Sequence, residues 1–398
     1  AEGCVLIGTT NDNPRNADLT DDRGVLMCFD EATGEFLWQL TVPKRDDLRF
    51  FDSPKTGISC SPTVRDGRCY VVTNRGDVVC LDMKGMADGN DGPYTDEAAF
   101  MTDEGETLRT PGKTDADILW RFDMILEAGV RQHDTANCSP LIHNGLIYIG
   151  TANGLDADHA IVELPDAPTF IVLDAETGQL LARDDGWVGS NVVHGQWSSP
   201  VLGTIAGRET IIYGGGDGIL YAFTPLDKSA LVQAASNHAG ANTKNDDGKI
   251  DLTALPRIRT LWTFNGQPQL QTGQPFEFQP GRGSESYTCV ASPVIFEDRI
   301  YMAFSHDPWM GKKLGYFACI EPGDKTGDIT RSSLVWSQPI ERESLSSPSI
   351  ADGLAYLADN GGFVYCFDIV SGEMVWKEEI GGSIWGSTML ADGKIYIG

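Results

Sequence analysis

Three short sequence phrases recur in a fixed order through most of this 398-residue chain. The first is a Ser-Pro strand, found at 60–64, 138–142, 198–202, 291–295 and 347–351. The second is an aromatic strand ending in a turn, found at 67–76, 145–154, 211–218, 299–307 and 353–362. The third is a strand, an Asp, a Thr-Gly or Ser-Gly turn and a further strand, at 24–38, 170–182 and 362–376. Such repetition restricts the chain to architectures that assemble copies of one structural unit.

The repeated unit is predicted to be four antiparallel strands joined as a meander. Runs of alternating Val, Ile, Leu, Tyr and Phe, bounded by Gly, Asn and Asp, are typical of strands and hairpin turns. One such sheet is not stable alone, and radial stacking of several sheets buries both faces. The sequence therefore predicts an all-β fold, a β-propeller of four-stranded antiparallel blades. No helical period of about 10–15 residues separates the strands, which disfavours βαβ folds.

The order of the phrases predicts how the blades are divided. The chain begins with a second-type strand at 4–8, continues through five complete repeats, and ends with two strands near 384–390 and 394–397. We expect one propeller domain over 1–398 that is cut within a blade at both ends. Six or more blades are represented, and the intact ring would hold seven or eight. Inserts at about 83–117 and 226–257 separate the third and fourth strands of two repeats.

The net charge excludes several classes of partner. The chain has 57 acidic and 30 basic residues, a formal net charge of −27. Nucleic acids and anionic membrane surfaces need clustered Lys and Arg, so neither is an expected partner. No apolar run approaches the roughly 20 residues of a transmembrane helix.

The nine cysteines are predicted to be structural. Their number is odd, and no CxxC pair is present to suggest a thiolate zinc site. Ala222 and Val172 take the same place in other repeats, which indicates a small buried slot. Four cysteines stand two residues before an acidic residue at that place, and we expect them to be free and buried: Cys28, Cys80, Cys319 and Cys366.

Both inserts are rich in oxygen-bearing side chains, which hard cations prefer. The second contains the D-G-x-I core of an EF-hand loop, but Thr243 and Ala254 replace the first carboxylate and the bidentate Glu. Calcium and a solvated loop both remain open interpretations. The candidate calcium ligands are Asp88, Asn90, Asp91, Asn245, Asp247 and Asp251.

The phrases CFDEATGEFLW and CFDIVSGEMVW resemble the tryptophan-docking repeat of the pyrroloquinoline-quinone-like (PQQ-like) β-propeller superfamily. That superfamily includes quinoprotein alcohol dehydrogenases and a non-enzymatic outer-membrane assembly lipoprotein, and the short blades here are similar to those of its compact secreted bacterial members. The resemblance implies a periplasmic or secreted protein. It also implies tryptophans that dock on the neighbouring blade, with Ala182 departing from the pattern: Trp38, Trp120, Trp262, Trp336 and Trp376.

The resemblance to the dehydrogenases implies a bound PQQ, a calcium ion and an Asp base. Those enzymes place adjacent cysteines against the quinone, and this chain has no Cys-Cys pair. Bound quinone is therefore not supported by the cysteine pattern, and no catalytic residue is assigned. If the chain were an enzyme, the resemblance would make it a PQQ-dependent alcohol or sugar dehydrogenase.

The loops that lead into the first strand of each blade are the candidate ligand site. These loops converge at one mouth of a propeller, and loops on a rigid scaffold commonly carry function. Their His and carboxylate groups suit metal binding or acid–base work, and their aromatic rings suit a planar or sugar-like ligand. Alternatively, the polar groups satisfy one another around channel water. The candidates are His133, Asp134, His194, Gln196, Trp197, Glu285, Tyr287, Arg342, Glu343 and Trp385.

Three functional classes fit the sequence. The preferred one is an extracytoplasmic binding or scaffold propeller, whose ligand at the channel mouth is a protein partner, a small molecule or a glycan. The second is a PQQ-dependent oxidoreductase. The third is a calcium-dependent glycan-binding propeller.

Overall fold

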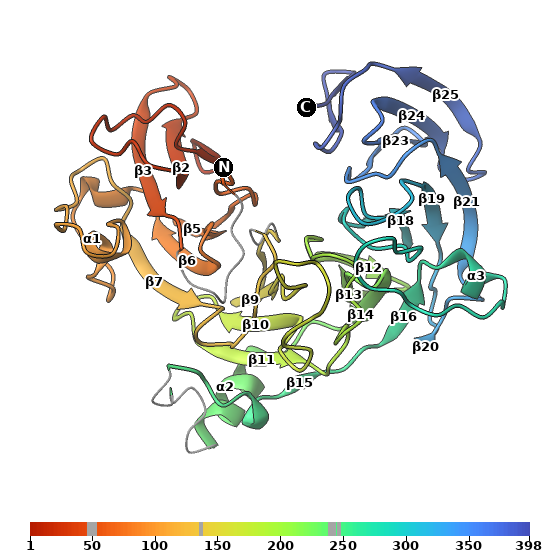
Figure 1. Cartoon of the computed structure of the whole chain (residues 1–398), viewed down its shortest axis with the longest axis horizontal. Helices are drawn as coiled ribbons and strands as arrows, with labels where there is room; N and C mark the ends of the chain where they lie inside the picture. The colour runs from red at the N-terminus through yellow and green to blue at the C-terminus, as the bar shows by residue number, and fades with distance from the viewer. Residues whose placement is uncertain (46–53, 135–137, 238–243, 245–247) are drawn as a thin grey trace. The chain divides into compact units, whose positions relative to one another are not determined.

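The computed structural model describes residues 1–45, 54–134, 138–237, 244 and 248–398. The fold is all-β and of the β-propeller type, as predicted, and its sheets follow one another along the chain (Figure 1). Helical segments within the described residues are short and lie mainly in the inserts. They are η1 (Gly85–Ala87), α1 (Glu97–Phe100), α2 (Lys228–Asn237), η2 (Leu252–Ala254) and α3 (Pro268–Gln271).

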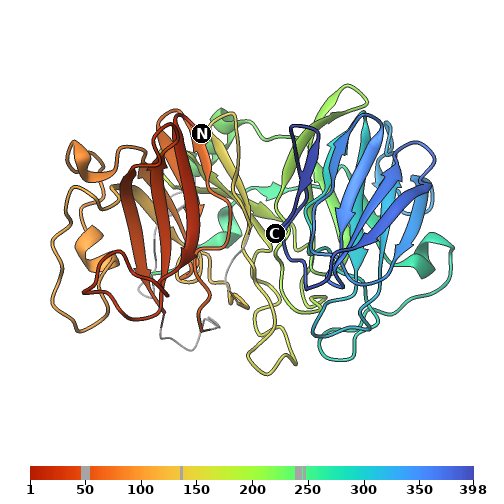
Figure 2. The ribbon, with the colours of Figure 1, turned by 90° about the horizontal axis from the view of Figure 1, so that it is seen from above.

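The chain divides into two compact units, and the first comprises residues 1–153, 166–184 and 227–257. It begins with a three-stranded sheet, whose strands run side by side in Figure 2: β1 (Cys4–Thr10), β2 (Arg23–Asp30) and β3 (Phe36–Pro43). The second sheet is β4 (Thr63–Arg65), β5 (Arg68–Val72), β6 (Asp77–Asp82) and β7 (Ile118–Asp123). The third is β8 (Leu141–His143), β9 (Leu146–Gly150), β10 (Phe170–Asp174) and β11 (Leu180–Asp184), with the short strand β15 (Arg257–Ile258) at its edge.

The second unit comprises residues 154–165, 185–226 and 258–398. Its first sheet is β12 (Val201–Ile205), β13 (Arg208–Gly214), β14 (Ile219–Phe223) and β16 (Trp262–Asn265), with β20 (Gly327–Asp328) parallel to β16 at the edge. The next sheets are β17 (Val294–Phe296), β18 (Arg299–Ser305), β19 (Gly315–Ile320) and β21 (Leu334–Ile340), then β22 (Ser349–Ala351), β23 (Leu354–Ala358), β24 (Phe363–Asp368) and β25 (Met374–Glu379). The last strands are β26 (Met389–Ala391) and β27 (Lys394–Tyr396).

Successive sheets bury hydrophobic side chains between them. One core cluster includes Ile212 and Phe264 from the first sheet of the second unit and Met302 and Phe304 from the next sheet. Another joins Tyr301 to Leu357 of the following sheet. The sheet of β17, β18, β19 and β21 contributes to both clusters, so its strands are apolar on both faces, which explains their nearly continuous hydrophobic runs.

The Ser-Pro phrase has a structural role at these sheet boundaries. The NH of Ser292 donates to Oγ of Ser347 at 3.1 Å, and the NH of Ser347 donates to Oγ of Ser387 at 3.0 Å. In the first unit the NH of Ser61 donates in the same way to Ser139. Each serine thus satisfies a backbone donor of the preceding sheet, which accounts for the repetition of the phrase.

The tryptophans of the fourth strands pack on the next sheet in most repeats. The indole NH of Trp38 donates to the carbonyl of Met83, that of Trp120 to Ala175, and that of Trp336 to Ile369. Trp262 is also buried, with 1% of its surface exposed. Trp376 is the exception, because 38% of its surface is exposed.

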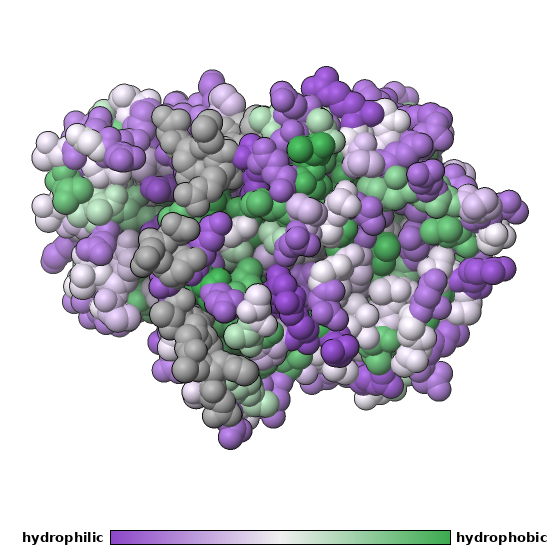
Figure 3. Space-filling view, turned by 60° about the horizontal axis from the view of Figure 1, so that its bottom comes forward, coloured by the Kyte–Doolittle hydropathy of each residue, from purple (hydrophilic) through white to green (hydrophobic). Residues whose placement is uncertain are grey.

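The four slot cysteines are free and buried, as predicted. The remaining five are also free, and Cys4 is the one that is partly exposed. Polar residues cover most of the face shown in Figure 3, with apolar residues in small groups between them. Within the described residues, no helix is both long enough and apolar enough to cross a membrane.

Candidate functional site

The second unit brings together loops from one end of several sheets. In a four-stranded meander, the loop before the first strand and the loop between the second and third strands lie at the same end of the sheet. His194 and Trp197 precede β12, and Trp385 precedes β26. Trp309 lies between β18 and β19. Strand order therefore places these four residues at one end of their sheets.

The four side chains form a continuous aromatic cluster. The His194 ring lies 5.1 Å from Trp197 and 5.6 Å from Trp309, measured between ring centroids. Trp309 in turn lies 5.2 Å from Trp385. These separations are typical of interacting aromatic pairs. We call His194, Trp197, Trp309 and Trp385 the aromatic cluster.

A buried histidine–aspartate pair supports the cluster. Nδ1 of His194 lies 3.1 Å from Oδ2 of Asp307, and the two residues are 4% and 0% exposed. The other carboxylate oxygen of Asp307 accepts the NH groups of Trp309 and Met310, each at 2.9 Å. Asp307 therefore fixes both the His194 ring and the backbone that carries Trp309, so the cluster is held in place by its surroundings.

Ion pairs and polar contacts surround the cluster on neighbouring loops. Glu285 is paired with Lys312, which lowers the pKa of the Glu285 carboxyl. Glu343 is buried, pairs with Arg342 and accepts a hydrogen bond from Asn360. Each of these two acidic groups is thus matched by a neighbouring basic group.

His306 lies near the Glu285–Lys312 ion pair, and its pKa is lowered. Burial is the largest cause that lowers the pKa of His306, and the Lys312 charge adds to it. The Tyr287 ring packs against His306 with centroids 4.3 Å apart. The indole NH of Trp385 donates to Oγ of Ser383 at 3.0 Å, which orients that exposed ring.

Eight of the ten predicted mouth residues belong to this unit: His194, Gln196, Trp197, Glu285, Tyr287, Arg342, Glu343 and Trp385. Gln196 is buried, with 1% of its surface exposed. His133 and Asp134 belong to the first unit, where His133 is fully buried, and their place at the same mouth stays a prediction.

Sequence reasoning missed Asp307 and Trp309. Both follow His306 in the loop between β18 and β19. Their position could have been predicted from the meander, because the loop between the second and third strands lies at the same end of the sheet as the loop before the first strand. His159 is half-buried, and its ring centroid lies 4.9 Å from that of His194.

The predicted calcium ligands are spread over both inserts. Asp88, Asn90 and Asp91 are exposed, and Asp88 pairs with Lys84 at 2.8 Å. Asp251 is exposed, and its carboxylate caps η2 by accepting from the NH and hydroxyl of Thr253. Asn245 and Asp247 lie outside the described residues.

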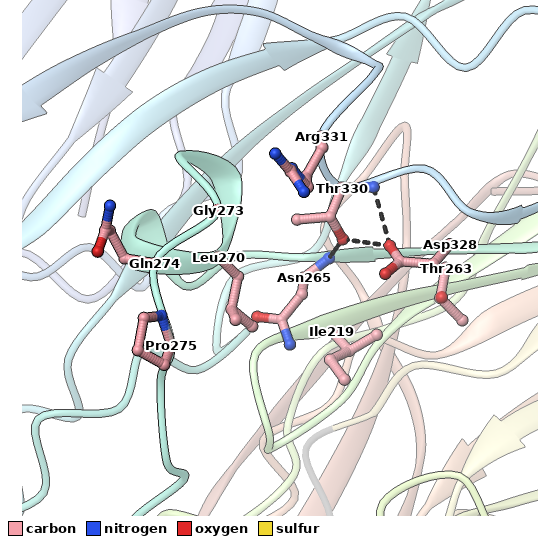
Figure 4. Close-up of a pocket in the computed structure, with 10 residues that line it drawn as sticks. All are labelled: Ile219, Thr263, Asn265, Leu270, Gly273, Gln274, Pro275, Asp328, Thr330 and Arg331. Carbon is pink, nitrogen blue, oxygen red and sulfur yellow. Dashed lines mark hydrogen bonds between the residues drawn. The ribbon is translucent and has the colours of Figure 1, made fainter.

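A separate hollow of about 470 Å³ lies beside β16 and β20. Figure 4 shows the segment with Gln274 and Pro275 on one side and Asn265 with Asp328 on the other. Oδ1 of Asp328 accepts from the NH and hydroxyl of Thr330, and Oγ1 of Thr330 accepts from the NH of Asn265. These polar groups are used in joining β20 to β16, so we assign the hollow no ligand.

The comparisons with known proteins identify the type of repeat. Residues 22–154 match the family model described as outer membrane protein assembly factor BamB. No curated protein matches the chain. The family match agrees with the β-propeller fold described above. The match covers about a third of the 398-residue chain, and the likeness to PQQ-like repeats holds for that part.

Similar solved structures include BamB and two dehydrogenases. BamB from Moraxella catarrhalis is 12% identical, with 99% of this chain and 94% of that chain covered and a TM-score of 0.42. A europium-containing methanol dehydrogenase is 12% identical, with coverage of 97% and 78% and a TM-score of 0.44. A quinohemoprotein alcohol dehydrogenase from Pseudomonas putida HK5 is 14% identical, with coverage of 99% and 60% and a TM-score of 0.49. With TM-scores below 0.5, none of these likenesses supports an argument about function.

The cysteines of this chain do not fit the quinone site of the dehydrogenases. All nine are free, and eight are buried. Cys28, Cys80, Cys319 and Cys366 lie within strands, each opposite a tryptophan of the neighbouring strand. No two cysteines adjoin in sequence to contact a quinone ring. We therefore derive no chemical step that involves PQQ.

Proposed function

We propose that this protein is an extracytoplasmic binding propeller that holds a segment of a partner protein on the aromatic cluster. The observation that carries the proposal is the pair of exposed tryptophans. Trp309 and Trp385 are 52% and 53% exposed, although their ring centroids lie 5.2 Å apart. Large exposed apolar groups that lie together are typical of interaction sites.

The support beneath these rings favours binding over incidental exposure. Asp307 orders the Trp309 backbone, and Ser383 orders the Trp385 indole. A rigid aromatic anchor loses little conformational entropy on binding, so it contributes more of its contact energy to affinity. Trp is among the residues that most often dominate protein–protein binding energies.

The charge of the chain supports a partner with basic residues near its apolar anchor. The net charge is −27, whereas the ion pairs beside the cluster balance locally. A negative protein accelerates the encounter with a basic partner, and the effect weakens as salt screens the charges. We therefore propose an extended basic segment carrying at least one apolar side chain as the ligand.

The matched family model supports the same class of function and the location. Its name describes an assembly factor for outer membrane proteins, a role that requires protein partners outside the cytoplasm. We propose a periplasmic or secreted location in a bacterium on this ground. Stacked tryptophans also suit sugars, so glycan binding is the outcome that competes with ours.

Peptide selection tests the proposal. A random peptide library displayed on phage would be selected on the wild-type protein and on a Trp309→Ala/Trp385→Ala double variant. We expect wild-type selections to enrich peptides with basic and apolar residues, and we expect the double variant to bind those peptides at least tenfold more weakly. Trp376→Ala serves as the control, because Trp376 is also exposed but lies on β25, away from the cluster residues.

Two further measurements separate the alternatives. Affinity for the enriched peptides should fall as salt concentration rises. Equal binding by the double variant would contradict the proposal, and so would binding of oligosaccharides with no enrichment of peptides. A visible absorbance band on adding PQQ and calcium to the wild-type protein would favour the oxidoreductase instead.

A further inference from the structure

The first insert contains two buried carboxylates whose charge is not matched by the protein. Glu97 begins α1, and Asp117 immediately precedes β7. They are 2% and 0% exposed. Oε1 of Glu97 and Oδ1 of Asp117 are both buried without a hydrogen-bond partner. Within the described part of the chain, no Lys, Arg or His forms an ion pair with either residue.

Two buried, unpaired carboxylates lower the stability of the fold unless a positive charge or hydrogen bonds compensate them. An uncompensated carboxylate in a protein interior costs several kcal/mol. Asp117 lies close enough to Glu97 for their negative charges to repel each other. Asp82, Asp88 and Asp91 add further negative charge near Asp117. A bound cation would offset this repulsion.

The surrounding chain contacts these two residues through backbone NH groups and the Asn90 side chain. The NH of Asp91 donates to Oδ2 of Asp117 at 3.0 Å, which holds the loop of Asn90 and Asp91 over Asp117. The Asn90 side chain lies within hydrogen-bonding reach of Glu97, where it lowers the pKa of that carboxyl. The NH of Asp82 donates to the carbonyl of Asp117, so β6 fixes the base of the site. Asn90 and Asp91 are exposed at the surface of the insert.

We propose that Glu97 and Asp117 bind a calcium ion, together with the side-chain oxygen of Asn90, main-chain carbonyl oxygens of the insert and water. Two carboxylates match the charge of a divalent ion, and an all-oxygen set favours Ca²⁺ over Zn²⁺ or Cu²⁺. A loop-based site of variable geometry suits Ca²⁺ better than Mg²⁺, which requires a near-ideal octahedron. With two carboxylates, we expect a Kd of about 10⁻⁴–10⁻³ M, as in extracellular calcium modules.

This assignment differs from the ligand set predicted from sequence. Asp88 pairs with Lys84, and Asp251 caps η2, so neither is included. Asn90 is retained, and Asp91 acts through its backbone NH on Asp117. Glu97 and Asp117 enter because of their burial.

Urea denaturation with and without calcium tests the site on the full chain. At about 10 mM CaCl₂, the folding equilibrium constant of the wild-type protein should rise about 10- to 100-fold over that in EDTA. Glu97→Gln and Asp117→Asn should abolish the rise. In EDTA the same variants should be as stable as the wild type or more stable, because each removes a buried negative charge. A variant that loses the calcium response but is at least as stable as the wild type in EDTA distinguishes a metal ligand from a carboxylate that only stabilises the fold.

Matched controls localise the effect. Asp88→Asn should retain the calcium response, since Asp88 is exposed and already paired. Asp251→Asn examines the second insert and should also retain it. Asn90→Ala, an exposed position, should weaken calcium binding severalfold in isothermal titration even if the Glu97 and Asp117 variants fail to fold. A wild-type protein that does not respond to calcium would overturn the proposal, as would loss of the response in Asp251→Asn but not in Glu97→Gln.

Discussion

Val172 lies directly across the strand pair from Ala182, where other repeats place a smaller residue opposite a tryptophan. The corresponding pairs are Cys28 with Trp38, Cys80 with Trp120, Ala222 with Trp262, Cys319 with Trp336 and Cys366 with Trp376. In the third sheet of the first unit, loss of the tryptophan thus coincides with a larger slot residue. The slot is small because it faces an indole, and the paired volumes compensate each other.

This pairing predicts a favourable coupling between Cys80 and Trp120. Cys80→Val adds volume against the ring and should cost about 1–3 kcal/mol of unfolding free energy. Trp120→Ala alone should cost about 3–5 kcal/mol, because the ring is buried and leaves a cavity. The double variant reproduces the natural Val–Ala pair and should be at least about 0.5 kcal/mol more stable than additivity predicts. Additive effects in urea denaturation would show that the two volumes are independent.

Trp120 also restricts the size of the side chain that the neighbouring sheet can carry at position 178. A Cβ atom built on Gly178 would lie 2.5 Å from the Trp120 ring, whereas one on Gly34 meets nothing within 4 Å. The two glycines have nearly the same φ, +73° and +72°. Gly34→Ala should therefore cost about 1 kcal/mol for backbone conformation alone. Gly178→Ala should cost that amount plus about 1–3 kcal/mol for displacing the ring. Equal losses of unfolding free energy for the two variants would rule out a packing role for Gly178.

The strand order could be predicted from the sequence because the same phrases recur in the same order in each repeat. Each Ser-Pro and Asp-turn phrase occurs at the same place in a meander, so errors at one repeat are corrected by the others. The two short strands β15 and β20 were not predicted, since each is two residues long and joins a sheet that precedes it in the sequence. Such pairing depends on tertiary packing and leaves no local pattern.

The candidate sites were predicted less completely because several of their residues occur in only one repeat or in an insert. The loops before the first strands were found because they are equivalent in every repeat, whereas Trp309 stands in a loop of one repeat alone. Glu97 has the sequence surroundings of an ordinary surface helix, and nothing local indicates that it is 2% exposed. Burial of a charged residue inside an irregular insert is set by contacts distant in sequence, which composition does not report.

The cysteines should resist modification until the protein unfolds. Burial raises the pKa of Cys60 and of Cys138 to about 12, and that of Cys319 to about 11. Because the thiolate is the reactive form, less than about one thiol in a thousand would be ionised at neutral pH at each of these sites. Intact mass after brief treatment with N-ethylmaleimide should show at most one adduct on the native protein, at the partly exposed Cys4, and nine in urea. A Cys4→Ser variant should lose the native adduct; rapid labelling of several sites would contradict the burial described above.

Asp217 should make the stability of the second unit depend on pH. Burial is the largest cause that raises the pKa of Asp217 to about 7, and hydrogen bonds from Tyr221 and Ile219 oppose it. An unfolded Asp has a pKa of about 3.9, so the folded state binds an extra proton between these values. Its contribution to stability is therefore complete below about pH 4 and is lost as the pH rises to about 7.

Replacing Asp217 with Asn isolates this contribution from those of the other acidic residues. The stability of the wild type minus that of Asp217→Asn should fall by about 1.4 kcal/mol per pH unit between pH 4 and 7, where one proton is released on unfolding. It should level off above about pH 8, because the carboxylate is then charged in both states. Urea denaturation at a series of pH values measures the difference directly. A difference that stays flat across this range would mean that Asp217 is charged in the folded protein, and that its buried oxygen atoms are better solvated than the contacts with Tyr221 and Ile219 indicate.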